Sequence, residues 1–339
     1  MSVELALCLD RDLQRHNTLG LPCVAERFID AESPARLAAA VAMAQQAGWP
    51  LTVLGGGSNL ILPRRLSGLV VRPTFADWDY RRDAEGGIAL RVEAGMNWHA
   101  LVMASVDRGW WGIENLALIP GHCGAAPIQN IGAYGVELAD VLESVELLHL
   151  DSGRYETLTG AACRFGYRDS IFKGALAGRV VITALNLMLS ETPHPRLGYG
   201  DLATRVTDAP SPRDVAEAVV AIRREKLPDP AQLANAGSFF KNPLVSAEQA
   251  QHLLVDCPDM PHFAQPDGRV KLAAGWLIDR CGLKGVRRGA FGVHDRQALV
   301  LVHHGGGDAE GLLAFAAEIA AAVEERFGVA LSREPRLAG

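Results

Sequence analysis

Three consecutive glycines, 55–57, followed by Ser58 and Asn59, form the most distinctive short motif of the chain. They follow an apolar run at 51–54 and precede a second one that stops at Pro63. Glycines accept positive φ angles, so a run of them lets backbone N–H groups converge on an anion such as a phosphate. No helix opens after the glycines and no Gly-Lys-Ser/Thr follows, which excludes the dinucleotide fingerprint and the P-loop. A tight turn between two buried strands is the alternative interpretation.

A second stretch, 112–135, is rich in Gly, Ala, Asn and Pro and almost without charge. An exposed linker would be more polar, and a core helix would lack the glycines. Small, uncharged residues let the main chain pass close to a flat, bulky ligand. The alternative is a buried irregular loop, which is costly unless its backbone groups find partners. We favour a cofactor contact.

Taken by residue type alone, Arg168, Ser238 and Glu334 each have an ordinary interpretation. Arg168-Asp169 resembles a surface or capping pair, Ser238 a loop or cap serine, and Glu334 a solvated carboxylate. Pro335 biases Glu334 toward an extended conformation, which restricts the direction of its side chain. Residue types alone therefore do not assign these positions to a reaction.

Composition limits the classes of protein to which the chain can belong. Its 339 residues, 49% hydrophobic and 21% charged, predict a soluble globular protein with two or three domains. A net charge of −6 argues against general nucleic-acid binding. The six cysteines have neither C-x-x-C nor metal-ligand spacing, so we expect no metal and a reducing cytoplasm. No signal-peptide core and no apolar run near ~20 residues occurs, so we expect no membrane insertion.

Periodicity and capping residues predict mixed α and β elements. Ser33-Pro34 and Gly48 bound a helix between two strands. The other expected elements before residue 227 are strands at 24–29, 68–72, 88–92 and 180–189, a hairpin of 141–150 with 155–158, and helices at 97–108 and 212–226. Beyond the Leu227–Pro230 break we expect helices at 246–255, 271–281 and 308–327, a strand at 298–303 and a final strand ending at Glu334. The expected domains are 1–73, 74–226 and 227–339.

Six motifs occur together in a specific order: Leu54–Asn59, Ile119–Gly121, Ile128–Gly135, Tyr167–Ser170, Leu227–Pro230 and Ala236–Pro243. This ordered set resembles the UDP-N-acetylenolpyruvoylglucosamine reductase (MurB) family, from Asn17 to Arg336. The segment 197–202, with Tyr199, looks like the tyrosine loop of the type I branch.

The resemblance implies an α+β fold: two FAD-binding subdomains of the PCMH/vanillyl-alcohol-oxidase type and a smaller α+β substrate-binding domain. FAD would lie between the two subdomains, bound non-covalently, with its pyrophosphate on the glycine motif. The implied cofactor-binding residues are Gly55, Gly56, Gly57, Ser58, Asn59, Ile119, Pro120, Gly121, Gln129, Asn130, Gly132 and Ala133.

The implied reaction reduces UDP-N-acetylglucosamine enolpyruvate to UDP-N-acetylmuramate for peptidoglycan synthesis, with NADPH as reductant. FAD N5 would deliver the hydride and Ser238 the proton, while Arg168 and Glu334 would face the substrate carboxylate. The implied substrate-binding residues are Tyr134, Tyr199, Lys226, Asn242, Lys284 and Gln297. We expect a cytoplasmic monomer whose partners are the nucleotide sugar and NADPH.

Two departures and two alternatives stay open. Ala125-Ala126 replaces hydroxyl residues that are frequent in type I relatives, and Pro335 replaces a β-branched residue. One alternative is another flavin oxidase or dehydrogenase of this fold, with FAD attached covalently through His122 or Cys123. The other is a non-catalytic flavin- or nucleotide-sugar-binding protein, which would have no need of the Arg168, Ser238 and Glu334 set.

Overall fold

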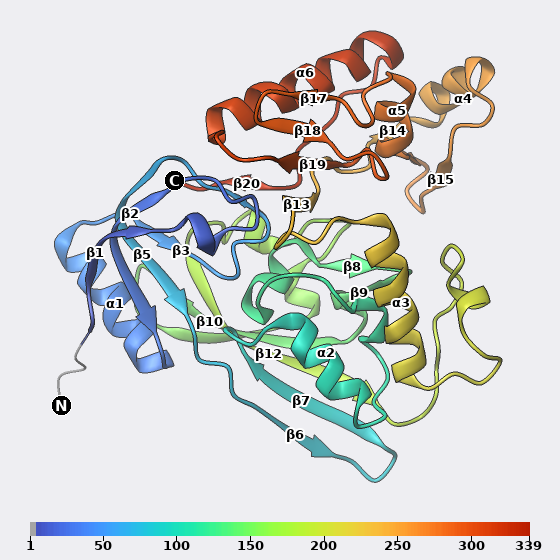
Figure 1. Ribbon diagram of the computed structural model, residues 1–339. Helices are drawn as coiled ribbons and strands as arrows, with labels where there is room; N and C mark the ends of the chain where they lie inside the picture. The colour runs from blue at the N-terminus through green and yellow to red at the C-terminus, as the bar shows by residue number, and fades with distance from the viewer. Residues whose placement is uncertain (1–4) are drawn as a thin grey trace. The chain divides into compact units, whose positions relative to one another are not determined.

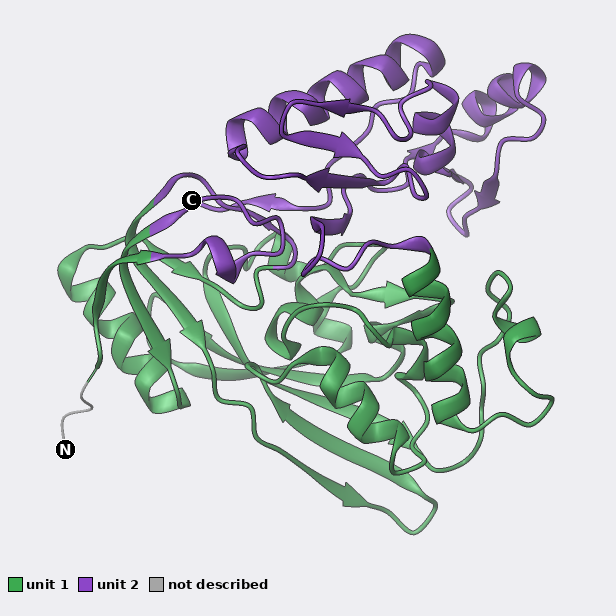
Figure 2. Cartoon of the chain, in the orientation of Figure 1, with its two compact units in different colours: residues 1–11, 25–57, 66–225 green, residues 12–24, 58–65, 226–339 purple. Residues whose placement is uncertain are grey.

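The computed structural model describes residues 5–339, and this part of the chain divides into two compact units (Figure 2). Unit 1 contains the chain up to Arg11, Ala25–Gly57 and Leu66–Glu225, and unit 2 contains Asp12–Val24, Ser58–Arg65 and Lys226–Gly339. The chain thus passes from unit 1 to unit 2 inside the glycine motif, between Gly57 and Ser58.

The first sheet has four strands in the order β1-β2-β5-β3 (Figure 1). They are β1 (Cys8–Asp12), β2 (Val24–Ala31), β5 (Arg65–Pro73) and β3 (Leu51–Val53). Helix α1 (Pro34–Ala47) packs its buried Leu37, Ala40, Val41 and Ala44 in one core with residues of β2 and β5. The Ser33 side chain accepts a hydrogen bond from the Arg36 N–H, and Gly48 ends the helix at φ 66°. Both predicted bounds of α1 are confirmed.

The second sheet of unit 1 is antiparallel, with five strands in the order β11-β10-β12-β7-β6. They are β6 (Trp78–Arg82), β7 (Gly87–Glu93), β10 (Leu142–His149), β11 (Tyr155–Thr159) and β12 (Val180–Ser190). The predicted hairpin is confirmed, since Val145 of β10 faces Leu158 of β11. Helices α2 (Trp98–Val106) and α3 (Pro212–Lys226) contribute buried residues to the same core as this sheet.

Short elements connect the longer ones, above all between α2 and β10. They are the 3-10 helices η1 (Gln14–His16), η2 (Glu114–Leu116), η3 (Cys123–Gln129), η4 (Leu138–Asp140), η5 (Ala161–Cys163), η6 (Ile171–Lys173) and η7 (Leu202–Arg205), and the two-residue strands β8 (Gly132–Ala133) and β9 (Val136–Glu137). The low-charge stretch 112–135 therefore folds as tight turns and 3-10 helices.

Unit 2 contains the sheet β13-β19-β18-β17, the sheet β14-β16-β15 and the parallel pair β20-β4. The strands are β13 (Ala234–Ser238), β19 (Val300–His303), β18 (Phe291–Val293), β17 (Arg287–Arg288), β14 (Leu244–Val245), β16 (Val270–Leu272), β15 (His262–Ala264), β20 (Arg336–Leu337) and β4 (Leu60–Ile61). The helices are α4 (Ala247–Asp256), α5 (Ala274–Arg280) and α6 (Ala309–Phe327).

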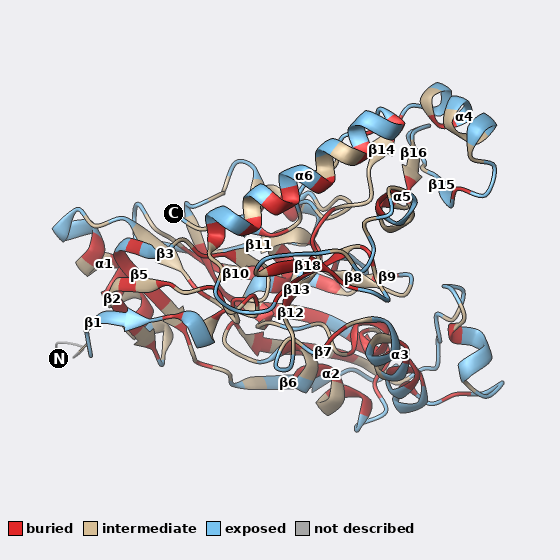
Figure 3. Ribbon diagram, turned by 45° about the horizontal axis from the view of Figure 1, so that its top comes forward, coloured by how far each residue is buried: buried red, intermediate tan, exposed pale blue. Residues whose placement is uncertain are grey.

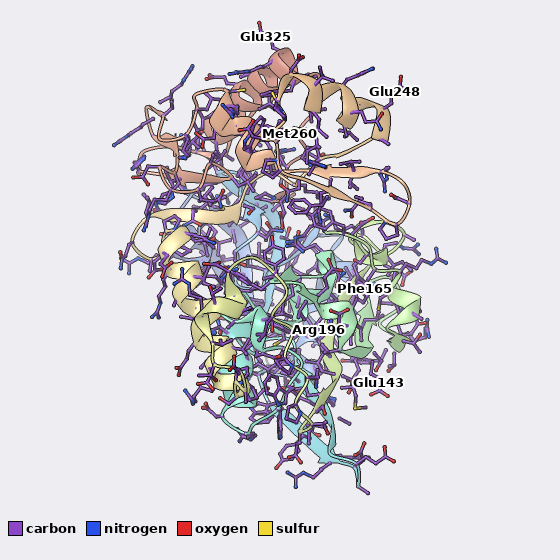
Figure 4. All side chains as sticks on the ribbon, turned by 90° about the vertical axis from the view of Figure 1, so that its right-hand side faces the viewer. Glu143, Phe165, Arg196, Glu248, Met260 and Glu325 are labelled. Carbon is purple, nitrogen blue, oxygen red and sulfur yellow. The ribbon has the colours of Figure 1, made fainter. Side chains whose placement is uncertain are left out.

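Helix α6 covers the core of unit 2 with one side only (Figure 3). Its N-cap is Asp308, whose side chain accepts a hydrogen bond from the Gly311 N–H. Figure 4 shows Glu325 of α6 and Glu248 of α4 pointing outward, whereas Met260 is buried in the core of the unit. Among residues 5–339, no helix combines the length and the apolar character that crossing a membrane requires.

Two predicted elements of the C-terminal third were wrong in their bounds. The helix expected at 271–281 begins at Ala274, because Lys271 and Leu272 pair with the neighbouring strands β14 and β15. The strand expected to end at Glu334 is instead Arg336–Leu337, which pairs with Leu60–Ile61. In both places strand pairing across the unit decides the local structure.

Candidate functional site

The glycine motif and the segment around Gly121 lie in direct contact within unit 1. The Leu54 N–H donates to the Val71 carbonyl (2.9 Å), which fixes the start of the loop, and Gly57 has a φ of 63°. A Cβ atom on Gly56 would lie 2.8 Å from the Gly121 Cα. Only glycine fits at this approach, so the structure brings together two of the predicted cofactor segments.

Backbone hydrogen bonds hold the segment after Gly121 on the end of β7. The Cys123 N–H donates to the Met96 carbonyl (2.8 Å) and the Gly124 N–H to the Ala94 carbonyl (2.9 Å). A Cβ on Gly124 would lie 2.6 Å from the Ala94 Cβ. Close packing against Ala94 therefore explains why residue 124 is a glycine. Ala125 is exposed and lies next to the glycine motif: a Cβ added to Gly55 would be 3.7 Å from the Ala125 Cβ.

Backbone strain is concentrated in this region. Six non-glycine residues among 5–339 have positive φ, and five of them fall between 118 and 168: Leu118, Asn130, Tyr134, Arg164 and Arg168. Such conformations persist only where surrounding contacts enforce them, and they are frequent at ligand sites. At Asn130 the side chain of the residue itself makes these contacts: it donates to Glu137 Oε2 (2.7 Å) and accepts from the Ala139 N–H (3.0 Å). Its side chain thus positions the loop that carries residues 132–135.

Arg168 lies against this same loop. Its Nη2 donates to the Gly132 carbonyl at 2.6 Å, and its guanidinium lies 5.4 Å from the ring centroid of Tyr167. The Lys173 Nζ donates to the Arg168 carbonyl at 3.0 Å, which helps hold the positive-φ backbone. The predicted carboxylate-binding arginine and the predicted cofactor residue Gly132 are therefore neighbours, and Arg168 is half-buried.

Tyr134 and Tyr199, two predicted substrate residues, lie edge to face with ring centroids 5.8 Å apart. Asn115 ties their loops together, since its Nδ2 donates to the carbonyls of Tyr134 and Arg196 at 2.8 Å each. Burial raises the pKa of the Tyr134 hydroxyl above its ordinary value. The Tyr199 side chain is largely exposed.

Arg223 is a candidate site residue that the sequence analysis missed. Its Nε is buried without a hydrogen-bond partner, and its guanidinium makes no hydrogen bond or ion pair with any residue that the structure describes. Burial lowers the pKa of Arg223. Tyr134 raises this pKa and the charge of Arg168 lowers it, which indicates that Arg223 lies near Tyr134 and Arg168. Its spacing could have indicated that it faces the core, because Arg223 lies four residues after the buried Val219 on α3 and therefore on the same face of the helix.

Ser238 and Glu334 come together in unit 2. The ladder between β13 and β19 is irregular between Asn235 and Ser238, where Gly237 has a φ of 68°. Such irregularities re-aim side chains next to functional sites. The Glu334 N–H donates to the Phe239 carbonyl at 2.9 Å, which places Glu334 beside the residue that follows Ser238. Within residues 5–339 the Ser238 hydroxyl has no hydrogen-bond partner.

The second half of the glycine motif belongs to this unit and joins the same network. The Asn59 carbonyl accepts from the Arg336 N–H (3.1 Å), two residues after Glu334. The Ser58 carbonyl accepts from the Thr18 hydroxyl (3.5 Å), and the Thr18 carbonyl accepts from the Asn235 N–H (2.9 Å). Unit 2 thus links the motif to the strand of Ser238 and to the tail of Glu334.

The remaining predicted substrate residues are spread over unit 2. Asn242 and Gln297 both reach the start of α5: Asn242 Oδ1 accepts from the Ala274 N–H (3.0 Å), and a Cβ on Gly275 would lie 3.1 Å from Gln297 Oε1. Lys284 is tied to the other end of α5 by an exposed ion pair with Asp279 (2.7 Å). Lys226 is the exposed last residue of α3.

Two family models match the chain: an FAD binding domain over residues 25–159, and the C-terminal domain of UDP-N-acetylenolpyruvoylglucosamine reductase over residues 229–338. The UDP-N-acetylenolpyruvoylglucosamine reductase of Chromobacterium violaceum is 50% identical over 96% of this chain and 97% of its own. The solved MurB structure from Thermus caldophilus shares 25% identity with a TM-score of 0.66, covering 98% of each chain.

A structure of 6-hydroxy-D-nicotine oxidase from Arthrobacter nicotinovorans, at 15% identity and a TM-score of 0.50, covers 97% of this chain and 87% of its own and shares the fold alone. The predicted α+β flavoprotein fold is therefore confirmed. The 50% identity with the Chromobacterium violaceum reductase, over nearly the whole length of both chains, establishes more than a fold: the chain belongs to the UDP-N-acetylenolpyruvoylglucosamine reductase family.

Proposed function

We propose that this protein is a flavin-dependent reductase that converts UDP-N-acetylglucosamine enolpyruvate into UDP-N-acetylmuramate with NADPH. The observation that carries the proposal is made in a member of this family: Ser238, whose hydroxyl has no hydrogen-bond partner in residues 5–339, directly precedes Phe239, whose carbonyl accepts from the Glu334 N–H. A protein that only binds the nucleotide sugar or FAD needs no positioned proton donor.

The residues of the site fit FAD. The Gly56–Gly121 approach leaves half-buried backbone without side chains, and the adjacent exposed Ala125 adds only a methyl group. Bound FAD would accept a hydride from NADPH and donate it at N5 to the enolpyruvyl double bond. We propose that residues 55–59, 119–121, 129, 130, 132 and 133 hold it, with Asn130 acting through the loop geometry that its side chain fixes.

Arg168, Glu334 and Ser238 have separate roles in this proposal. Hydride addition to one carbon builds negative charge on the neighbouring carbon and on the attached carboxylate, which a fixed cation stabilises. Arg168 supplies that cation, and Glu334 orients the same carboxylate. Ser238 gives its proton to the carbon, and we propose that the fully buried Phe239 and Phe240, which follow it in the chain, help to keep water away.

The nucleotide part of the substrate needs polar and cationic groups. We assign Tyr134, Tyr199, Lys226, Asn242, Lys284 and Gln297 to this task and add Arg223. A guanidinium whose Nε is buried without a protein partner carries a desolvation cost that an anion can offset. The enzyme would work as a cytoplasmic monomer with domains at 1–73, 74–226 and 227–339; its six free thiols suit a reducing compartment.

The purified protein is expected to be yellow, with about one FAD per chain that acid denaturation releases into the supernatant. Reducing it with NADPH under argon and then adding UDP-N-acetylglucosamine enolpyruvate should restore the oxidised flavin spectrum. A colourless protein that cannot be reconstituted with FAD contradicts the proposal. Flavin that stays with the precipitate would instead indicate covalent attachment and an oxidase of the same fold.

Arg223→Gln is expected to raise KM for the nucleotide sugar by about 10- to 100-fold while the bound FAD remains. The reason is that a buried charge-assisted hydrogen bond to a substrate anion contributes about 1.5–3 kcal/mol. Arg224→Gln is the matched control, because Arg224 is the exposed neighbour on the same helix. Steady-state kinetics with both variants measure the difference, and equal KM values would contradict the role of Arg223.

A further inference from the structure

His122 follows Gly121 directly and stands at the centre of the contact between the two cofactor segments. Its Cδ2 lies 3.4 Å from where a Cβ on Gly56 would be. Its backbone is fixed on both sides, since the Gly121 carbonyl accepts from the Trp98 N–H (3.0 Å) and the His122 carbonyl from the Ala125 N–H (3.0 Å). The imidazole is therefore held against the middle of the glycine motif.

The ring has an unmatched polar atom. His122 Nδ1 is buried and has no hydrogen-bond partner among residues 5–339, although a buried imidazole nitrogen normally has one. Turning the ring by 180° about Cβ–Cγ exchanges Nδ1 with Cδ2 and leaves the backbone unchanged. After this turn, Cδ2 occupies the buried position that offers no hydrogen-bond partner, and Nδ1 faces Gly56.

The charge state of the ring suits a neutral hydrogen-bond donor. Burial, followed by the charge of Arg72, lowers the pKa of His122 below its ordinary value, so the imidazole is neutral at pH 7. A neutral imidazole carries one N–H and can therefore donate one hydrogen bond to an anion. The adjacent Cys123 cannot compete for this role, because its thiol is fully buried and burial raises its pKa far above the usual range.

We propose that His122 donates a hydrogen bond from Nδ1 to the pyrophosphate of FAD, on the side of the site formed by Gly56. The inference rests on the proposed binding of FAD and goes beyond it by adding the side chain of His122 to the phosphate site proposed from the backbone N–H groups of the glycines. It also gives His122 a function that differs from covalent attachment of the flavin.

Three variants test the role of Nδ1. His122→Leu removes both nitrogens, His122→Asn keeps an amide near the position of Nδ1, and His122→Gln places its amide near Nε2. The dissociation constant of FAD, measured by titrating apoprotein, should rise about 10-fold or more in His122→Leu and His122→Gln. It should stay within about 3-fold of the parent in His122→Asn. Phosphorus-31 NMR of the bound FAD should shift in His122→Leu.

His149→Leu is the control, because His149 lies in unit 1 but pairs with Glu156 in the β10–β11 hairpin. The melting temperature of each apoprotein separates ligand binding from packing. A His122→Leu variant with parental FAD affinity overturns the proposal. So does a His122→Leu variant whose melting temperature falls as much in the apoprotein as in the holoprotein, because the effect would then come from packing. An Asn variant as weak as the Leu variant also overturns it. If the parent protein itself binds no FAD, the proposed function fails instead.

Discussion

Ser238→Ala is expected to slow reduction of the enolpyruvyl group by about 10²-fold or more and to leave reduction of the bound flavin by NADPH nearly unchanged. The Ser238 proton is needed only after the hydride has reached the substrate, so its loss affects one half-reaction. The Ser238 hydroxyl makes no hydrogen bond within residues 5–339, and removing it therefore breaks no hydrogen bond of the fold. Stopped-flow absorbance of the flavin resolves the two steps.

Two further variants complete this experiment. Ser238→Cys should recover part of the lost rate, because a thiol also delivers a proton. Ser246→Ala is the structural control: Ser246 caps α4 by accepting from the Gln249 N–H at 3.1 Å, so its loss should cost about 1 kcal/mol of stability with normal rates. A Ser238→Ala enzyme that is reoxidised normally by substrate, or that is slow only with NADPH, would show that Ser238 is not the proton donor.

Sequence patterns predicted those parts of the fold whose signals are local. Ser33, Pro34 and Gly48 define α1 because capping acts within one turn of the helix. By contrast, β13 contains Asn, Ala and Gly and has low strand propensity, yet it pairs with β19. At Val270–Leu272 pairing with two strands replaced the expected start of a helix. Local propensity could not predict the pairing of β13 with β19 or of β16 with β14, because these partners are distant in sequence.

The candidate site divides in the same way. The glycine motif could be interpreted as an anion site from its residue types, and its contact with Gly121 fits that interpretation. Arg168 and Ser238 lie in the ordered motifs and Glu334 was assigned by the family resemblance, since each residue alone favours an ordinary role. Arg223 was missed because α3 carries adjacent arginines, and only the packing of the helix distinguishes Arg223, whose Nε is buried, from the exposed Arg224.

Arg168→Ala is expected to lower turnover with the enolpyruvyl substrate by at least about 10²-fold. A fixed charge facing developing negative charge contributes ~3 kcal/mol or more to the transition state. Because Arg168 Nη2 also donates to the Gly132 carbonyl, the flavin content of the variant must be measured before its rates are compared. Arg168→Lys should recover only part of the rate, since an ammonium group lacks the planar fork that pairs with a carboxylate.

Arg164→Ala provides the matched control for the backbone, because Arg164 also has a positive φ, 49° against 52° for Arg168, and is exposed. Both substitutions place alanine in the same left-handed conformation, so any backbone cost appears in both melting temperatures, whereas only Arg168→Ala removes the proposed cation. Glu334→Gln should produce a similar loss of turnover with intact flavin, because the amide replaces the carboxyl group that is proposed to orient the substrate carboxylate. If Arg168→Ala and Arg164→Ala have equal turnover at equal flavin content, the carboxylate of the substrate is stabilised by another cation, and Arg223 becomes the first residue to test.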